Sequence, residues 1–237
     1  MKKNNFDLII PIYNEGQSII NLVKKIQKKI KFNFNIIFCY DSKKDNIFNY
    51  KKELKKIKKP VFFVKNPSKG PCTAVKAGLY YTKNKCKIVY PADDFINIHL
   101  IEKMYKIFKK DKPDIIVASR FIKGGSMIGC PLIKSILVRL ASKSLYIMSS
   151  IPVRDASNGF RMFSNRLLKK VKIESKVGFA YSLELLVKCE RLKLKIKEIP
   201  AKWEERSIGQ SRFKILKWLP QYLKWYFYGL ATFWLSK

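Results

Sequence analysis

The sequence predicts an α/β fold in which a mostly parallel sheet carries helices on both faces. Two observations predict it: apolar runs of strand length recur through the first two-thirds of the chain, and stretches with helical periodicity separate them. The runs are continuous rather than alternating, which is typical of parallel strands buried on both faces. The expected strands cover residues 6–12, 35–40, 61–65, 87–90 and 115–119.

The helices follow from the spacing of apolar side chains. Between the first two strands, apolar residues recur at helical spacing with lysines on the opposite side; they are Ile19, Ile20, Val23, Ile26 and Ile30. Further helices are expected at 44–58, 72–83, 98–110 and 131–152. Repeated strand–helix units build a parallel sheet with helices on both sides. The aromatic stretch 213–234 is expected to add an amphipathic helix at the C-terminal end.

The chain is strongly basic. Its 237 residues include 50 Lys+Arg and 17 Asp+Glu, which gives a formal net charge of +33. This excess indicates either a polyanionic partner, such as nucleic acid or an anionic membrane, or a generally solvated basic surface. The lysines are spread over most of the expected helices, which favours the general surface. Because no known nucleic-acid-binding motif is present, a nucleic-acid-binding protein is only a distant alternative.

Composition excludes several classes of protein. Hydrophobic residues make up 47% of the chain, which is too much for a disordered protein. No uninterrupted apolar run reaches the ~18–20 residues that cross a bilayer. Asp7 and Pro11 interrupt the N-terminal apolar run, so we expect no signal peptide. The 5 cysteines show no CxxC pair, which favours free thiols in a reducing, cytoplasmic compartment.

Polar or flexible residues follow each expected strand. In an open parallel sheet, ligands bind outside the carboxyl ends of the strands, so these segments are the candidate site. They are Pro11 to Glu15, Asp41 with Asp45, Lys69-Gly70-Pro71, Asp93-Asp94 and Ser119-Arg120. Neither a GxxxxGK[ST] phosphate loop nor a GxGxxG motif is present, which removes the signatures of the common ATPases and dinucleotide-binding proteins.

An ordered set of motifs covers residues 6 to 213. The set comprises Ile10 to Glu15, Tyr40-Asp41 through Asp45, Lys69-Gly70 with Ala74 and Gly78, Ala92-Asp93-Asp94, Ser119-Arg120-Phe121, Asp155 to Arg161, Ser182-Leu183-Glu184, and Trp203 through Arg206, Gly209, Ser211 and Phe213. In this order they resemble the family 2 glycosyltransferases of the GT-A fold, particularly the polyprenyl-phosphate (dolichyl-phosphate) sugar transferases. The resemblance implies a GT-A, Rossmann-like domain over residues 1–212 and a C-terminal membrane-interface segment over residues 213–237.

The resemblance also implies a donor site. An inverting enzyme of this kind moves a hexose from a nucleotide sugar, either GDP-mannose or a UDP-sugar. The residues expected to bind the nucleotide sugar are Pro11, Tyr13, Glu15, Asp41, Gly70 and Asp93. Asp93 and Asp94 are expected to hold Mg²⁺ or Mn²⁺ against the diphosphate, since hard cations take oxygen ligands. Pro91 replaces the first acid of the family's usual Asp-x-Asp, and Asp94 is expected to compensate.

The expected acceptor is a polyprenyl or dolichyl phosphate. A phosphate monoester carries about −1.5 to −2 charges at pH 7, so it needs cations rather than a general base. Arginine provides a planar fork that suits phosphate. We expect Arg120, Arg161, Arg206 and Arg212 to clamp the phosphates, and Asp93, Arg120 and Arg161 to be catalytic.

The expected location is peripheral, on the cytoplasmic face of a membrane. Lysines flank aromatic residues in the C-terminal stretch, a composition that suits the headgroup interface. Either the anionic membrane surface alone or an integral membrane partner subunit would anchor the enzyme. An ordinary amphipathic helix packed on the domain is the competing interpretation of this stretch. A family 2 glycosyltransferase with a glycan or polysaccharide acceptor is the alternative function.

Overall fold

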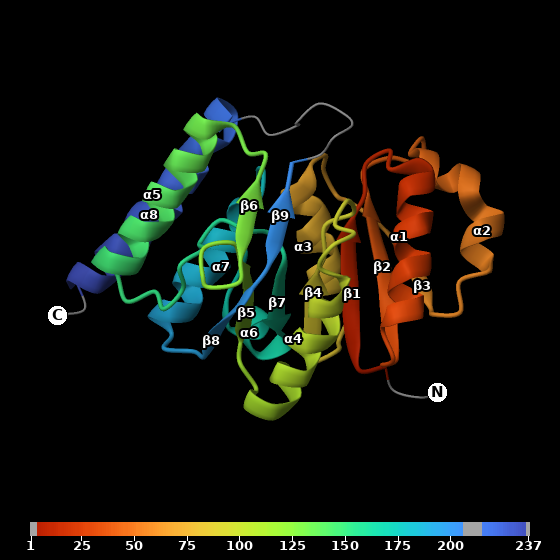
Figure 1. Cartoon of the computed structure of the whole chain (residues 1–237), viewed down its shortest axis with the longest axis horizontal. Coiled ribbons are helices and arrows are strands. Elements are labelled where there is room, and N and C mark those ends of the chain that lie inside the picture. Colours follow the sequence, from red (N-terminus) through yellow and green to blue (C-terminus); the bar gives the residue numbers. More distant parts are fainter. Residues whose placement is uncertain (1–3, 206–214, 236–237) are drawn as a thin grey trace.

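A 7-stranded sheet with the order β3-β2-β1-β4-β7-β5-β8 lies at the centre of the computed structural model, which describes residues 4–205 and 215–235 (Figure 1). The strands are β1 (Phe6–Pro11), β2 (Phe34–Tyr40), β3 (Val61–Lys65), β4 (Cys86–Val89), β5 (Ile115–Ser119), β7 (Arg161–Ser164) and β8 (Ile196–Pro200). The expected mostly parallel sheet is confirmed, and each of the five expected strands is present within one or two residues of its expected ends.

One strand runs against the others. β7 lies between β4 and β5 and is antiparallel to both, with Arg161 opposite Val89 and Val117. Its four residues are too few to give a pattern in the sequence, so it was not expected. Because β7 is antiparallel, its first residue lies at the edge where β4 and β5 end. The segment that precedes Arg161 is therefore delivered to the candidate site.

Helices cover both faces of the sheet and form a hydrophobic core on each. On one face lie α1 (Gly16–Lys29) and α4 (Ile98–Asp111), which share a core with the side chains of Leu8, Ile36 and Ile88. On the other lie α3 (Pro71–Tyr81), α6 (Asn165–Lys170) and α7 (Ala180–Arg191), which pack on Ile9, Ile37 and Val117. The arrangement with helices on both faces is thus confirmed.

The helix expected at 44–58 is two short elements instead, η1 (Asn46–Tyr50) and α2 (Lys51–Lys55). The carboxylate of Asp45 accepts a hydrogen bond from the amide of Ile47 at 3.0 Å and so caps the start of η1, two residues after the expected start. Only Ile47 and Leu54 of these two elements are buried, which leaves little apolar contact to support a longer helix.

A second sheet of two strands, β6 (Ser126–Ile128) and β9 (Lys202–Glu204), was not expected either. The two strands are parallel and lie outside the large sheet. Each has three residues, which is too short to show a period in the sequence.

Two long helices lie side by side at one end of the molecule (Figure 1): α5 (Leu132–Met148) and α8 (Ile215–Leu235). The hydroxyls of Ser144 and Tyr226 are 2.7 Å apart across their contact. Trp225 of α8 is buried in the domain core, and its indole N–H donates to Ser175 Oγ at 2.8 Å. The expected C-terminal helix therefore exists, with one face packed on the domain.

The boundary expected between residues 212 and 213 lies outside the described residues and stays a prediction. Within the described ranges, no helix combines the length and apolar character that a membrane crossing requires.

Candidate active site

The carboxyl ends of β1, β2, β3, β4 and β5 meet at one edge of the sheet. Ile12, directly after β1, donates its amide to Cys39 O of β2 at 2.9 Å, and Tyr90, directly after β4, donates to Ile9 O of β1 at 2.9 Å. The segments that follow these strands therefore lie next to one another, as the rule for parallel sheets requires.

Asp41, directly after β2, joins two of the segments at this edge. Its carboxylate accepts the Gly70 amide at 3.1 and 3.2 Å and the side-chain amide of Asn66. Gly70 has φ +115° and open space around it, a conformation that favours glycine. It precedes Pro71, the first residue of α3. The structure thus brings Asp41 and Gly70 together, as expected, and adds Asn66 as a residue that the sequence did not indicate.

The loops after β1 and β2 are tied together beside Asp41. Asp45 accepts the Asn14 amide at 2.9 Å, and Asn46 accepts the Gly16 amide at 2.8 Å. These bonds fix the loop that carries Tyr13, whose side chain is 50% exposed at the edge.

Asp93 and Asp94 follow β4 but have different surroundings. Asp93 is exposed. Asp94 is largely enclosed: its carboxylate accepts the amides of Ile96 at 3.0 Å and Asn97 at 2.8 Å, and the side-chain amide of Asn97 at 2.8 Å. Burial raises the pKa of the Asp94 carboxyl, while these hydrogen bonds act in the opposite direction.

The donor set at this edge fits a hard divalent cation held mainly by its substrate. Among residues 4–205 and 215–235, no three acidic, histidine or cysteine side chains gather into a metal-binding group. Mg²⁺ is commonly bound by one or two carboxylates together with substrate phosphates, and the exposed Asp93 provides one such carboxylate.

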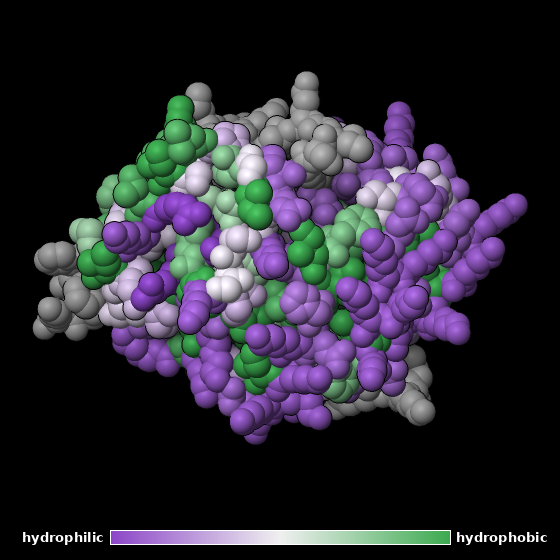
Figure 2. Space-filling view, viewed as in Figure 1, coloured by the Kyte–Doolittle hydropathy of each residue, from purple (hydrophilic) through white to green (hydrophobic). Residues whose placement is uncertain are grey.

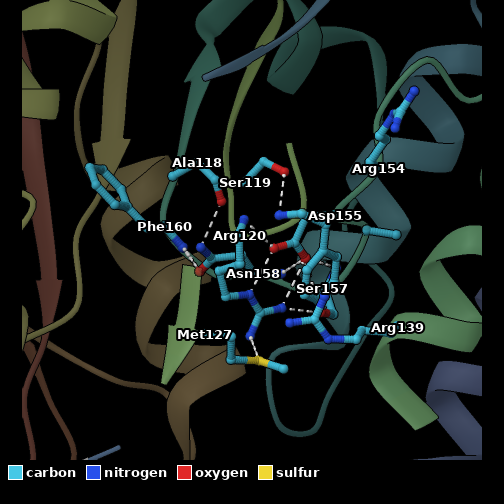
Figure 3. Close-up of polar contacts among 12 residues, drawn as sticks. Ala118, Ser119, Arg120, Met127, Arg139, Arg154, Asp155, Ser157, Asn158 and Phe160 are labelled. Carbon is cyan, nitrogen blue, oxygen red and sulfur yellow. Dashed lines mark hydrogen bonds and ion pairs between the residues drawn. The ribbon is translucent and has the colours of Figure 1, made fainter. Parts of the chain in front are cut away.

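Arg120 lies directly after β5. It forms a bidentate pair with Asp155, with Nε at 2.7 Å from Oδ2 and Nη2 at 2.9 Å from Oδ1 (Figure 3). Nη2 also donates to Ser157, and Nη1 lies 3.5 Å from Met127 Sδ. Burial alone would raise the pKa of the Asp155 carboxyl, but the charge and hydrogen bonds of Arg120 outweigh burial and hold this pKa below its ordinary value.

Arg161 lies inside the protein rather than at its surface. Its side chain is fully buried, and its guanidinium donates to the carbonyls of Asn158 at 2.7 Å, Ser182 at 2.6 Å and Ala156 at 2.7 Å. Burial lowers its pKa to about 10, although the charge of Asp155 opposes this. The guanidinium therefore stays charged at neutral pH and supports the segment that carries Asp155. The expected role of Arg161 in binding phosphate stays a prediction.

Arg139 of α5 is the functional candidate that sequence reasoning missed. Its guanidinium carbon lies 4.8 Å from the centre of the Phe121 ring, and that of Arg120 lies 5.0 Å from the same ring. Figure 3 shows Arg139 beside the Arg120 network. Within the described part of the chain, no carboxylate forms an ion pair with Arg139. Only eight of the 50 basic residues are arginines, and this rarity is the one feature of the sequence that could have drawn attention to Arg139.

Arg206 and Arg212, also expected in the clamp, lie outside the described residues, so their roles stay predictions.

The large sheet, its order and the acids at its carboxyl edge define the class of the GT-A glycosyltransferases. Solved structures show the same fold. Glucosyl-3-phosphoglycerate synthase from Mycobacterium tuberculosis, in complex with Mn²⁺, UDP and glucosyl-3-phosphoglycerate, aligns with a TM-score of 0.65 at 14% identity over 97% of this chain and 80% of that one. A mannosyltransferase from Pyrobaculum calidifontis, in complex with GDP-Man and Mn²⁺, aligns with a TM-score of 0.61 at 13% identity over 96% of this chain and 64% of that one.

Residues 7–172 match the sequence family Glycosyl transferase family 2, and the chain belongs to this family. Its relatives include a dolichyl-phosphate beta-glucosyltransferase of Trichomonas vaginalis, 27% identical over 88% of this chain and 68% of the relative. A dolichol-phosphate mannosyltransferase of Pyrococcus furiosus is 25% identical over 92% of this chain and 63% of the relative. The chain thus spans about two-thirds of the length of these relatives. The expected family and enzyme class are confirmed.

Proposed function

We propose that the protein transfers a hexose from a nucleotide sugar to a polyprenyl phosphate at a membrane surface, with inversion at the anomeric carbon. One observation carries this proposal. Arg120 and Arg139 share the Phe121 ring at the proposed acceptor side of the site, and Arg139 belongs to α5, which carries exposed apolar side chains such as Leu132, Ile133 and Leu137. A cationic site on an apolar helix suits an acceptor that combines a phosphate with a lipid chain. The two dolichyl-phosphate transferases among the relatives support the same acceptor class.

In the reaction, an oxygen of the acceptor phosphate attacks the anomeric carbon of the donor sugar. The bond between that carbon and the β-phosphate oxygen breaks, and the nucleoside diphosphate leaves with the electron pair. The attacking phosphate is already ionised, so no side chain has to remove a proton. The side chains instead orient two anions that repel each other.

The donor is assigned to the edge around Asp41, Gly70 and Tyr13, where carboxylate and backbone groups are available for a base and a ribose. Asp93 would hold a divalent cation, with Glu15 and Pro11 lining the same edge. A divalent cation bound there supplies positive charge that neutralises the departing diphosphate. Mn²⁺ in the two structural neighbours supports a divalent cation, and Mg²⁺ would satisfy the same ligand chemistry.

The acceptor phosphate is assigned to Arg120 and Arg139. Arg120 is oriented by Asp155, and Nη1 has a second N–H besides the one that it donates to Met127 Sδ. Arg139 contributes a positive charge that no carboxylate among the described residues neutralises. Arg161 supports this site from the protein interior, because it donates hydrogen bonds to the carbonyls of Asn158 and Ala156 in the segment that follows Asp155.

The membrane contact is assigned to α5 and α8. Their exposed apolar side chains are Leu132, Ile133, Ile136, Leu137, Leu140, Ile147, Met148, Leu219, Leu223 and Phe227. Figure 2 shows apolar surface over this end of the molecule and hydrophilic surface over most of the remaining face. Lys134, Arg139 and Lys143 lie on α5 among these residues, and basic residues beside apolar ones suit an anionic lipid surface.

The decisive experiment is a radiolabelled transfer assay with GDP-mannose, UDP-glucose and UDP-N-acetylhexosamines as donors and polyprenyl phosphate in liposomes as acceptor. We expect labelled lipid from one donor class, dependent on Mg²⁺ or Mn²⁺. Asp93→Ala should abolish the effect of the cation on donor affinity, measured by calorimetry. Transfer only to a glycan acceptor, with none to the lipid phosphate, would reject the proposal.

A further inference from the structure

A two-stranded ribbon connects the loop that carries Asp93 with Arg120. The ribbon consists of β6 and β9, with Ser126 opposite Lys202 and Met127 opposite Trp203. Neither strand pairs with the large sheet. β9 continues the chain of β8 after Ala201, so its start is fixed by the large sheet, and contacts at its two sides fix the remainder.

On the donor side, Asn97 binds the ribbon to the metal loop. Its side-chain amide donates to Lys202 O at 2.6 Å, and its side-chain oxygen accepts the Lys202 amide at 3.0 Å. This pair of bonds has the pattern that a neighbouring strand would offer to β9. The same side-chain amide donates to Asp94 Oδ2, and the Asn97 backbone amide donates to Asp94 Oδ1, both at 2.8 Å. Asn97 is 3% exposed.

On the acceptor side, β6 contacts Arg120 directly. Met127 Sδ lies 3.5 Å from Arg120 Nη1. The start of the ribbon is also held at the end of β5, because Ala201 donates its amide to Ser119 O at 2.8 Å and accepts the Ser126 amide at 3.1 Å. A shift of β9 would therefore reach the guanidinium through β6.

We propose that Asn97 is a positioning residue that sets the spacing between the metal loop and the acceptor arginines. The inference rests on the proposed function, because it concerns the alignment of donor and acceptor within that site. Asn97 touches neither substrate. It acts by holding β9 against the loop of Asp93, so that the acceptor phosphate oxygen lies within reach of the anomeric carbon of the donor.

The same geometry gives Asp94 a supporting role in place of metal binding. Its three hydrogen bonds all go to the segment that begins at Ile96, and they orient the Asn97 amide toward Lys202. If Asp94 is a metal ligand, an amide at position 94 removes negative charge from the metal and weakens its binding. If Asp94 is only a hydrogen-bond partner of position 97, an amide can replace it, provided that position 97 carries the carboxylate.

The test compares N97A with the exchanged pair D94N/N97D. The exchanged pair keeps the net charge, an amide-to-carboxylate bond between the two positions, and an acceptor for the Lys202 amide. It replaces the bond to Lys202 O with an unfavourable contact, because a carboxylate oxygen then faces that carbonyl oxygen. For N97A we expect kcat to fall by about 10-fold or more, because small misalignments of reacting groups are costly, while donor KM stays within about twofold. D94N/N97D should recover part of the lost kcat, because only the bond from the Lys202 amide is restored.

N84A is the matched control. Asn84 also donates a side-chain amide to a carboxylate, Asp7, at 2.7 Å, but it precedes β4 at the opposite edge of the sheet. Its kcat should stay within about twofold of the parent value. Hydrogen exchange adds a readout that needs no turnover: backbone amides of β6 and β9 should exchange faster in N97A and at the parent rate in N84A.

Unchanged kcat in N97A would overturn the proposal. If the exchanged pair binds the Mn²⁺–donor complex as poorly as D93A does, Asp94 is a metal ligand and its supporting role is wrong. If N97A unfolds, the kcat of D94N/N97D and the hydrogen exchange of its β6 and β9 amides still test the proposal. Failure of the parent enzyme to use any lipid phosphate would reject the proposed function. Faster hydrogen exchange of β9 in N97A would still support the role of Asn97 in holding β9 against the loop of Asp93.

Discussion

Arg120 and Asp155 form a bidentate ion pair whose side chains are 10% and 0% exposed. Two further backbone amides, of Ser157 and Asn158, donate to the same carboxylate at 3.2 Å. The pair joins the end of β5 to the segment before β7. It consequently holds the Arg120 guanidinium in one orientation.

Removing Asp155 should destabilise the protein as well as the site. D155N leaves the Arg120 charge nearly buried without its partner, and losses of about 3–5 kcal/mol are typical of such changes. Urea unfolding at pH 7 measures this. E102Q is the control: Glu102 forms a surface pair with Lys106 at 3.1 Å, and such pairs contribute about 0–1 kcal/mol. Equal losses in the two variants would contradict the role of the buried pair.

The same pair predicts a dependence on pH. The folded pKa of Asp155 lies below its unfolded value of about 3.9, so the stabilisation is complete above that value and is lost as the pH falls through the folded pKa. The free energy of unfolding of the parent protein should therefore fall more steeply below about pH 4 than that of D155N. Parallel acid titrations of the two proteins would refute this.

Arg161 should behave as a structural residue. R161M leaves several buried carbonyls without a donor, and each costs about 1–3 kcal/mol. We expect a large drop in Tm and a parallel loss of donor binding and transfer. R161K keeps the charge but cannot reach all of the carbonyls, so it should be intermediate. A variant with the parent Tm and a selective loss of transfer to lipid phosphate would instead restore Arg161 to the phosphate clamp.

Arg161 also shows where sequence reasoning stops. The motif from Asp155 to Arg161 was recognised, and so were the strands and acids of the donor side, because long apolar runs and the residues after them are local signals. Whether an arginine faces a ligand or the core depends on β7, whose insertion between β4 and β5 is a non-local pairing. Asn97 was missed for the same reason, since Lys202 is 105 residues away.

Lys87 should make stability rise in alkaline solution. It is 1% exposed and donates to Leu79 O and Thr82 O at the end of α3. Burial lowers its pKa to about 8, although Asp7 opposes this. From about pH 8 to the unfolded pKa of about 10.4, the unfolded chain binds more protons than the folded one, so this group adds stability as the pH rises.

K87M isolates this contribution, because cysteines and tyrosines also titrate in the alkaline range. The difference in unfolding free energy between the parent protein and K87M should increase in favour of the parent from pH 8 to pH 10. Guanidinium titrations at several pH values measure it. A constant difference would show that the Lys87 ammonium is not penalised by burial.

The apolar face of α5 should bind lipid independently of the chemistry. Leu137 is 54% exposed on this helix, and burying a leucine side chain contributes about 1.5–3 kcal/mol. L137D should therefore weaken binding to liposomes with anionic lipids by about 10-fold or more, measured by flotation, since 1.4 kcal/mol corresponds to a factor of 10. Y81D is the control, because Tyr81 is 51% exposed at the end of α3 and away from α5. Both variants should transfer sugar equally to a short-chain, water-soluble prenyl phosphate, since Arg120 and Arg139 are unchanged.

Salt should weaken the binding of the parent protein, because its net charge of +33 attracts the anionic surface over a Debye length of about 10 Å at 0.1 M. Normal flotation of L137D, with binding that responds only to salt, would show that charge alone holds the enzyme at the membrane and that α5 does not enter it.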